Sequence, residues 1–537
     1  ESNPGDQEAL AAYIAALRAA EDFVPRELLE QRVFPRRSFH APANWQLSYQ
    51  DTDRREHSLN QSPAGQVEVP SHRSLRARVP DAVEGLDRTW ALLAAAGIHR
   101  VVLTEEAVDR SLLNVVDHQG LEELSIQSEH VTGSGLAHLA PLRRLTNLSL
   151  LQDRLDLSCE LRLPPSLSQL GLFGLHHDEE LRHALIQTPQ VRELCVGGEQ
   201  FSPTGWSVLG DLPWLRAISL AGSGSLNDES LRTLSSLSVE RLELGGVGDF
   251  SDGGLAALCR NLPALQSLRL ATRSRVARLQ PLQRLALTSL DLTCPRRLTP
   301  LVLDFPQTLR YLRLDFPTSD RQLSTLGPLP VLEHLSLSLT ENPRGEGLRR
   351  LQSFPLLRSL ALELDVEGLS AAGLGHLVHL ATLRELSLYG ASDQETSRIG
   401  EFGKLSSLTL TASHRRALST EGLACLGKLP HLELLNLTSA QVGSALACEH
   451  GFQRLVGLCL FNCTGLGDSI VRALSRATRL EFLYLHNCGP IQGLAALTKL
   501  PALKSVTLTT DAGATRETLA RMRSVRPGLL LNCRGDA

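Results

Sequence analysis

One apolar pattern recurs seventeen times between residues 121 and 508 of this 537-residue chain, and it limits the possible folds more than any other feature. An apolar residue is followed by two variable residues, a second apolar residue, one variable residue and a third apolar residue. Examples are LEELSI from Leu121, LTNLSL from Leu145 and LKSVTL from Leu503. Successive copies start 22 to 27 residues apart, and an eighteenth, IHRVVL, starts at Ile98. Self-similarity at such a period indicates stacked repeats.

Each copy has the apolar spacing of a short strand, because its fourth and sixth residues lie on one strand face. Between copies, leucines recur every three or four residues, as in GLAALCRNLPAL from Gly254, and this spacing is helical. A single unit cannot bury its leucines, so neighbouring units must stack. We therefore predict an α/β solenoid with parallel strands on the concave side and helices on the convex side.

The repeats resemble those of leucine-rich repeat proteins, in particular the ribonuclease-inhibitor-like class, whose horseshoe has convex helices. The phrases SDGGLAALCRNLPALQSLRL from Ser251 and STEGLACLGKLPHLELLNL from Ser419 are similar to bacterial repeats of about 24 residues. The resemblance covers roughly residues 98–537 and implies no particular ligand. The family usually carries Asn or Cys at the ninth repeat position. Here only Cys463 and Cys488 do so, and we expect less uniform turns.

Leucine is sparse before residue 100 and abundant after it, which indicates a boundary there. We predict N-terminal helices in 1–34, a polar linker in 35–80 and a capping helix in 81–97 with Trp90 inward. The solenoid of about 18 repeats follows in 98–510, and a C-terminal capping half-repeat in 511–537. Removal of residues 1–80 is expected to leave the repeats folded.

Charge and composition exclude several classes of protein. The 54 basic and 58 acidic side chains give a net charge of −4, so the chain lacks the basic excess of a nucleic-acid binder. No run of apolar residues is long enough to span a membrane. The ten cysteines show no tight clustering, which favours reduced thiols and a cytoplasmic location. The Arg-rich, Lys-poor composition favours a bacterial source.

Two segments carry partial motifs for chemistry. GLACLGK from Gly422 matches the start of a phosphate-binding loop, but Leu429 follows where Ser or Thr would reach Mg²⁺. His176, Glu180 and His183 have the spacing of a helical zinc site, but their segment is a charged face of the usual solvated kind. We predict no catalytic residues, no cofactor and no metal, and therefore no enzyme.

The concave face is the predicted site, because outward strand residues there vary freely. Most are small, so a few large or charged ones are expected to dominate binding. Aromatic and arginine side chains are enriched in binding hot spots. The predicted partner-binding residues are Leu434, Phe461, Phe482, Tyr484, His486, Tyr389, Tyr311, Arg241, Arg269 and Arg313.

These features predict a non-enzymatic scaffold that binds a protein partner along its concave face. The alternative is the sensor or substrate-recognition part of a larger machine, such as a ubiquitin-ligase adaptor or an NTPase-linked receptor. The catalytic part would then lie upstream or on another chain. FVPRELLEQ from Phe23 is similar to the opening of an F-box, although the rest of that motif is absent.

Overall fold

The computed structural model describes residues 37–534 with gaps. The gaps are 41–45, 51–55, 60–65, 70–74, 80–85, 105–106, 152–161, 176, 198–200, 222–226, 234–237, 248–250, 273–277, 294–301, 340–344, 365–368, 413–417, 444, 447–451, 467, 490, 492, 510–520, 523 and 527–528. The N-terminal helices predicted in 1–34, including the F-box-like stretch, lie outside the described residues. So do His176 and most of the predicted C-terminal half-repeat, namely residues 511–520, 523, 527–528 and 535–537.

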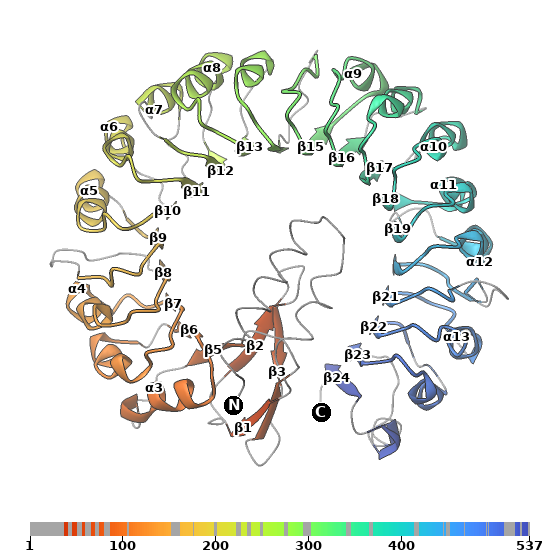
Figure 1. Cartoon of the computed structure of the whole chain (residues 1–537), viewed down its shortest axis with the longest axis horizontal. Helices are drawn as coiled ribbons and strands as arrows, with labels where there is room; N and C mark the ends of the chain where they lie inside the picture. Colours follow the sequence, from red (N-terminus) through yellow and green to blue (C-terminus); the bar gives the residue numbers. More distant parts are fainter. Residues whose placement is uncertain are drawn as a thin grey trace, which may run out of the picture. The chain divides into compact units, whose positions relative to one another are not determined.

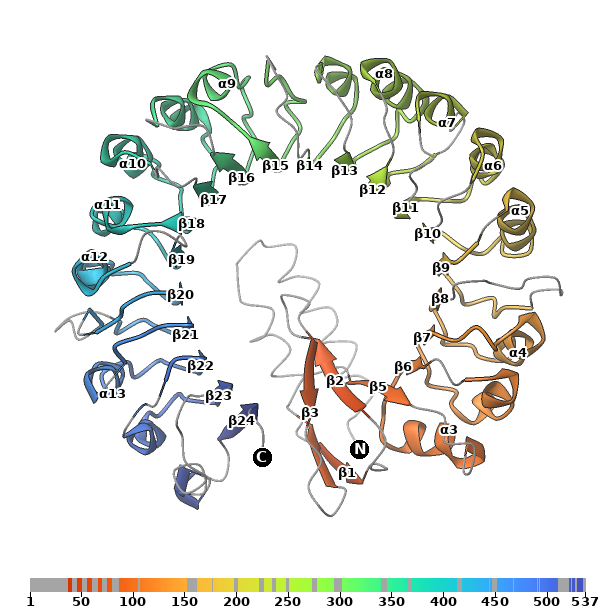
Figure 2. The same cartoon turned by 180° about the vertical axis from the view of Figure 1, so that it is seen from behind.

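The chain forms two compact units, which we describe separately. Unit 1 comprises Glu1–Ser225 and Thr233–Val239, and unit 2 comprises Leu226–Arg232 and Glu240–Ala537. Both are built from the same element, a parallel strand followed by a helical return. Figure 1 shows, within each unit, the strands on the inner side of the curve and the helices on the outer side, and Figure 2 shows the same arrangement from behind.

Unit 1 begins with strands where we had expected a polar linker. β2 (Gln46–Gln50) pairs antiparallel with β3 (Glu56–Leu59) and β5 (Leu75–Val79), while β1 (Arg37–His40) pairs with β4 (Gln66–Val69). Residues 35–80 are mostly polar, but they include short segments such as QVEV and LRARV in which polar and apolar residues alternate with the period of a strand. Hydrogen bonds then link β5 in parallel to the first repeat strand.

The rest of unit 1 consists of repeats capped by one helix. α3 (Leu86–Ala95) occupies the position predicted for the capping helix and buries Trp90, whose indole Nε1 donates to Ser111 O at 2.8 Å. The repeat strands are β6 (Arg100–Leu103), β7 (Glu123–Ile126), β8 (Asn147–Leu151), β9 (Gln169–Phe173), β10 (Glu193–Gly197) and β11 (Ala217–Ala221). The helical segments are η1 (Asp109–Leu112), η2 (Val115–Asp117), α4 (Gly133–Leu136), η3 (Ala137–Leu139), α5 (Asp178–Ile186), α6 (Pro203–Ser207) and η4 (Val208–Asp211).

Unit 2 continues the same pattern to the end of the chain. Its strands are β12 (Arg241–Val247), β13 (Ser267–Thr272), β14 (Ser289–Thr293), β15 (Tyr311–Pro317), β16 (His334–Leu339), β17 (Ser359–Leu364), β18 (Glu385–Ala391), β19 (Ser407–Ala412), β20 (Leu434–Thr438), β21 (Gly457–Phe461), β22 (Phe482–His486), β23 (Ser505–Thr509) and β24 (Leu530–Arg534). The last strand lies in the segment 511–537, where we expect a C-terminal capping half-repeat.

Short helical segments return the chain in unit 2. They are α7 (Asp228–Thr233), α8 (Asp252–Asn261), η5 (Gln280–Arg284), α9 (Asp320–Ser324), η6 (Glu346–Ser353), α10 (Ala371–Val378), α11 (Asp393–Thr396), η7 (Ile399–Glu401), α12 (Thr420–Leu423), η8 (Ala424–Lys428), α13 (Asp468–Leu474) and η9 (Leu494–Lys499). Many span a single turn, because a repeat of about two dozen residues leaves little length for a helix.

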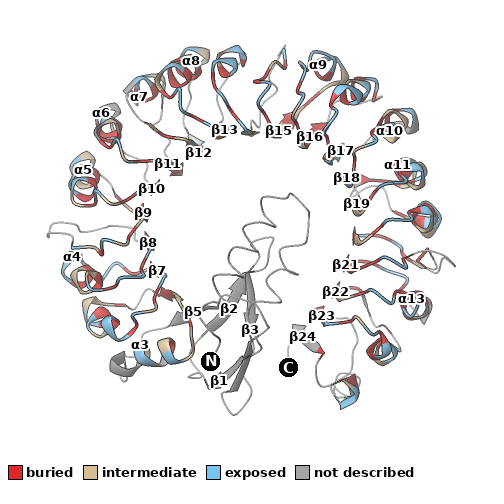
Figure 3. Ribbon diagram, viewed as in Figure 1, coloured by how far each residue is buried: buried red, intermediate tan, exposed pale blue. Residues whose placement is uncertain are grey.

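The predicted leucine-rich repeat solenoid is confirmed. Each of the eighteen sequence copies contains one strand, and every strand starts two residues after the first apolar residue of its copy. The fourth and sixth residues of a copy are buried: Leu435 and Leu437, for example, are 0 % exposed. Figure 3 shows that the buried residues lie where strands and helices face each other within each unit. The leucines therefore form a continuous core that no single repeat encloses.

A hydrogen-bonded interlock joins successive repeats on the helical side. An Asp in the first helical turn accepts a hydrogen bond from the backbone N of the Ser or Thr that caps the next helix. The pairs are Asp109 with Thr132 at 2.7 Å, Asp178 with Ser202 at 3.0 Å, Asp228 with Ser251 at 2.7 Å and Asp393 with Ser419 at 2.7 Å. Three residues after each cap stands a glycine, and a Cβ on it would overlap the Asp carboxylate. The glycines are Gly135, Gly205, Gly254 and Gly422.

Candidate interaction surface

The ten predicted site residues all project from strands of unit 2. The first, third and fifth residues of these strands form the inner face of the unit, and the parallel register aligns them in rows across neighbouring strands. The predicted residues fall into two groups separated by mostly small side chains. One group lies on β12 to β15 and the other on β20 to β22, and Tyr389 on β18 stands between them.

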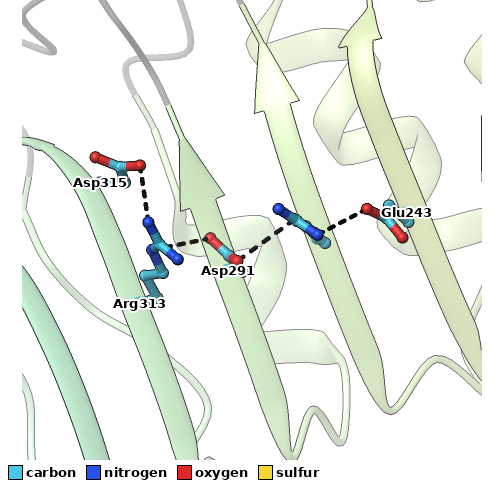
Figure 4. Close-up of polar contacts among 5 residues, drawn as sticks. Glu243, Asp291, Arg313 and Asp315 are labelled. Atoms are coloured by element: carbon cyan, nitrogen blue, oxygen red, sulfur yellow. Dashed lines mark hydrogen bonds and ion pairs between the residues drawn. The ribbon is translucent and has the colours of Figure 1, made fainter. Parts of the chain in front are cut away.

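The first group is organised around a row of alternating charges, which we call the charged row: Glu243, Arg269, Asp291, Arg313 and Asp315. Arg269 Nη1 lies 2.9 Å from Glu243 Oε1, and Arg269 Nε lies 3.5 Å from Asp291 Oδ2. Arg313 Nη2 lies 3.2 Å from Asp315 Oδ2, and Arg313 Nε lies 4.0 Å from Asp291 Oδ1 (Figure 4). Each guanidinium therefore already contacts two carboxylates of the chain itself.

Asp291 is the central member of the charged row. Its side chain is 15 % exposed, and Oδ1 makes no hydrogen bond among the described residues. Burial raises the pKa of this carboxyl above its ordinary value, while Arg313 and Arg269 oppose the shift. The row contains two arginines and three acids, so it presents a slight negative excess. Arg269 and Arg313, two of the predicted partner-binding residues, are thus already paired with acids of the same chain.

Tyr311 lies beside the charged row, in register with Ser289 on one side and His334 on the other. It is 37 % exposed, and its ring centroid lies 6.4 Å from that of His334. Burial of the other half of the side chain raises the pKa of the Tyr311 hydroxyl. Arg241 is exposed at the start of β12, in register with Ser267.

The second group brings together the predicted Leu434, Phe461, Phe482, Tyr484 and His486, which we call the aromatic cluster. The ring centroids of Phe461 and Tyr484 lie 5.0 Å apart, and those of Phe461 and His486 lie 6.0 Å apart. Phe461 and His486 stand side by side in the register of β21 and β22. All five side chains are half-buried, because each covers part of a neighbour.

Phe482 and Leu434 meet across an intervening strand. Gly457 of β21 stands between them in register, and a Cβ on this glycine would overlap the Phe482 ring and lie 2.9 Å from Leu434 Cδ2. The missing side chain lets the Phe482 ring occupy the space above Gly457. The cluster is therefore one contiguous apolar surface across β20, β21 and β22. In unit 1, Phe173 covers Gly197 in the same way.

In four of the described repeats the ninth position carries a small, buried side chain. Cys463 and Cys488 are free thiols, and their Sγ atoms donate to Leu437 O at 3.4 Å and Leu460 O at 3.3 Å in the preceding repeats. Ala391 and Ala440 occupy the same position in other repeats and are equally buried. These residues fix the turns that follow the strands.

The partial chemical motifs have local structural roles. Gly422 lies in α12 and belongs to an interlock, so GLACLGK forms a helical turn and not a strand-to-helix phosphate loop. The Glu180 carboxylate accepts a hydrogen bond from the backbone N of His177 at 3.2 Å, and His183 lies against Gln187. Among the residues that the structure describes, no three His, Cys, Asp or Glu side chains are grouped as metal ligands would be. Nor does the described part of the chain contain a helix with the length and apolarity needed to cross a bilayer.

Charged residues of the inner face such as Glu363 and Glu385 are not among the predicted site residues. Glu363 on β17 is exposed and lies in register beside Tyr389 on β18. Glu363 is the fifth residue of β17 and the seventh of LRSLALEL, an outward position, so the repeat phase alone could have placed it. A carboxylate in a single repeat carries no signal for binding, whereas aromatic and arginine side chains are enriched in hot spots.

No protein-family model matches the chain, and no curated protein matches it. Solved structures of similar fold include an internalin of Listeria monocytogenes, with 19 % identity over 67 % of this chain and 89 % of that one and a TM-score of 0.39. A leucine-rich repeat protein of Leptospira interrogans has 17 % identity over 64 % of this chain and 91 % of that one, with a TM-score of 0.35. TLR13 in a complex with a single-stranded RNA has 15 % identity over 85 % of this chain and 83 % of that one, with a TM-score of 0.39.

Proposed function

We propose that the chain is a non-enzymatic scaffold that binds a partner protein on the inner face of unit 2, with the aromatic cluster as its centre. The observation that carries this proposal is the contiguous surface formed by Leu434, Phe482, Phe461, Tyr484 and His486. Half-buried aromatic side chains with polar tips are characteristic of binding hot spots. The chain contains only 4 % aromatic residues, so their concentration on adjacent strands calls for a reason beyond strand propensity.

Charge supports a protein partner over a nucleic acid. The outward first, third and fifth residues of β12 to β22 include three arginines and five acids, Arg241, Arg269, Arg313, Glu243, Asp291, Asp315, Glu363 and Glu385. A phosphate backbone needs a basic surface, and this face has a net negative charge. We also propose, from the sequence, that the repeats are of the ribonuclease-inhibitor-like type with about 24 residues each, that the source is bacterial and that the protein is cytoplasmic.

A second candidate is the sensor or substrate-recognition part of a larger machine, such as a ubiquitin-ligase adaptor or an NTPase-linked receptor. The same inner face would then bind the substrate or signal, and another chain or an upstream domain would supply the chemistry. The favouring observation is that the four interlocks on the described helical side have a structural role, so the chemistry of such a machine would lie elsewhere. Identification of stable complex members would separate the two candidates.

The test is partner capture by a double variant, Phe482→Ala with Tyr484→Ala. Truncation of a central hot-spot aromatic costs about 2 kcal/mol or more, close to thirtyfold in affinity, so capture is expected to be lost. The matched control is Ser125→Ala with Ser149→Ala, two outward strand residues of unit 1. Because Phe482 covers Gly457, Phe482→Leu with Tyr484→Ala should be measured too, and melting curves should accompany every variant.

Two results would contradict this placement. One is unchanged capture by a folded Phe482→Ala, Tyr484→Ala chain. The other is loss of the partner only when Arg241, Arg269, Tyr311 or Arg313 is changed, which would move the site to the charged row.

A further inference from the structure

The fifth residues of strands β17 to β22 point away from the core, and together they form one unbroken row on the inner face of unit 2. The register runs from Glu363 to Tyr389, Thr411, Thr438, Phe461 and His486, and crosses β17 to β22 one strand at a time. We call it the fifth-position row. The row joins Tyr389, which otherwise stands apart, to the aromatic cluster, and the two threonines between them are short.

Glu363 and Tyr389 have the chemistry of a site for a cationic side chain. Both are exposed, Tyr389 by 43 %, and the carboxylate of Glu363 makes no ion pair with any described residue. A guanidinium or ammonium group can stack on a tyrosine ring while it donates to a carboxylate beside that ring. An unpaired acid next to an exposed aromatic ring therefore favours Arg or Lys over any neutral ligand.

The rest of this face does not supply the missing cation. The outward first, third and fifth residues of β16 to β22 include no lysine or arginine. The contrast with the charged row is direct: there each carboxylate has an arginine of the same chain within 4.0 Å. Among the residues that the structure describes, no cation pairs with Glu363, so a partner can supply the positive charge.

Spacing along the row sets the separation of the partner's two anchors. Tyr389 and Phe461 are three strands apart, which is about 14 Å at the usual strand separation. An extended chain covers that distance in roughly four residues. Thr411 and Thr438 line the interval with hydroxyl groups that can bond the backbone of such a segment.

We propose that the fifth-position row recognises an extended segment of a partner protein that carries an arginine or lysine about four residues from a large apolar side chain. The basic side chain binds between Glu363 and Tyr389, and the apolar one docks on the aromatic cluster. This inference rests on the proposed function and adds the chemistry of the partner to it.

The experiment is selection of short random peptides by the full chain, followed by affinity measurements with the selected peptides. Enriched sequences are expected to share a basic and an apolar residue at this separation. Glu363→Lys should weaken the selected peptides by about tenfold or more, because it places like charges together. A peptide whose basic residue is replaced by Glu should in turn bind the Glu363→Lys variant better than it binds the parent chain.

The outcomes separate the inference from the proposed function. The inference would be overturned, and the proposed function would stand, if the peptides bind the Phe482→Ala, Tyr484→Ala chain more weakly but bind the Glu363→Lys chain as tightly as the parent. Enrichment without a basic residue would overturn the inference in the same way. Failure to select any peptide, or indifference to both sets of variants, would contradict both proposals. Thr409→Ala, an outward change outside the row, is the matched control.

Discussion

Asp393 fills the space that a side chain at Gly422 would need. A Cβ on Gly422 would overlap Asp393 Oδ1, and the same oxygen accepts a hydrogen bond from the backbone N of Ser419 at 2.7 Å. Three other Asp–glycine pairs repeat this relationship between successive helices. The interlock is therefore a recurrent device that sets how one repeat stacks on the next.

The first prediction concerns this interlock. Gly422→Ala should destabilise the chain by about 1–3 kcal/mol, because the new methyl group displaces a carboxylate held by hydrogen bonds. Gly403→Ala is the control, since a Cβ there meets nothing within 4 Å. In an Asp393→Ala background the cost of Gly422→Ala should shrink, and a double-mutant cycle by chemical denaturation measures the difference. Equal costs in both backgrounds would remove the carboxylate as the cause.

The second prediction concerns pH. His118 is 0 % exposed, and its Nε2 lies 2.6 Å from Ile98 O, so the neutral ring donates to that carbonyl. Burial lowers the pKa of His118, and nearby His99 lowers it further. A depressed histidine pKa means that the unfolded chain binds the proton more tightly. The stability is therefore fully present above about pH 6.5 and is lost as pH falls toward the folded pKa.

The measurement compares unfolding free energies of the parent and His118→Gln between neutral and mildly acidic pH. Glutamine does not titrate, so the variant should show a shallower loss of stability on acidification. The other sixteen histidines are common to both chains, and all but His99, whose ring centroid lies 6.0 Å from that of His118, cancel in the comparison. Parallel pH profiles would show that His118 does not contribute.

The third prediction revises the boundary expected from the sequence. β5 pairs in parallel with β6 and buries Ala77, so a chain that starts at Asp81 loses a strand from the edge of the repeats. We expect it to melt several degrees below a chain that starts at Ser71 and keeps β5. Thermal unfolding of the two truncated chains tests this. Identical melting temperatures would restore the boundary near residue 80.

The fourth prediction concerns the thiols. The six cysteines whose side chains the structure describes are all free, and Cys463 and Cys488 donate to backbone carbonyls. Titration of thiols in denaturant without reductant should count all ten cysteines of the sequence. A count of eight, with Cys463 and Cys488 protected, would mean that these neighbours form a disulfide.

Much of this structure follows from the repeat phase. A single apolar pattern predicts eighteen strands. It also predicts which residues of each strand point into the core and which lie on the inner face, because side-chain direction alternates strictly along a strand. Phe461, Tyr484 and His486 could be grouped on that basis alone. The strands in 35–80 could not, because short polar strands have no repeated partner to reveal them.

The repeat phase does not predict which side chains of the inner face of unit 2 pair with one another. Arg269 and Arg313 look like free binding residues in the sequence, but their reach to Glu243, Asp291 and Asp315 depends on the rotamer of each long side chain. Phe482 likewise lies over Gly457 only because the residue at that position of the neighbouring strand has no side chain. Such relations require the register of neighbouring strands as well as the pattern within one.

The most direct measurement of binding on the inner face of unit 2 is site-specific photocross-linking. A photoreactive residue in place of Thr438, in the middle of the fifth-position row, is compared with one in place of Gln394, which is exposed on α11. The Thr438 probe should cross-link the captured partner, and excess selected peptide should suppress the product. Cross-linking from Gln394 with none from Thr438 would place the partner on the helical side and contradict the proposed function.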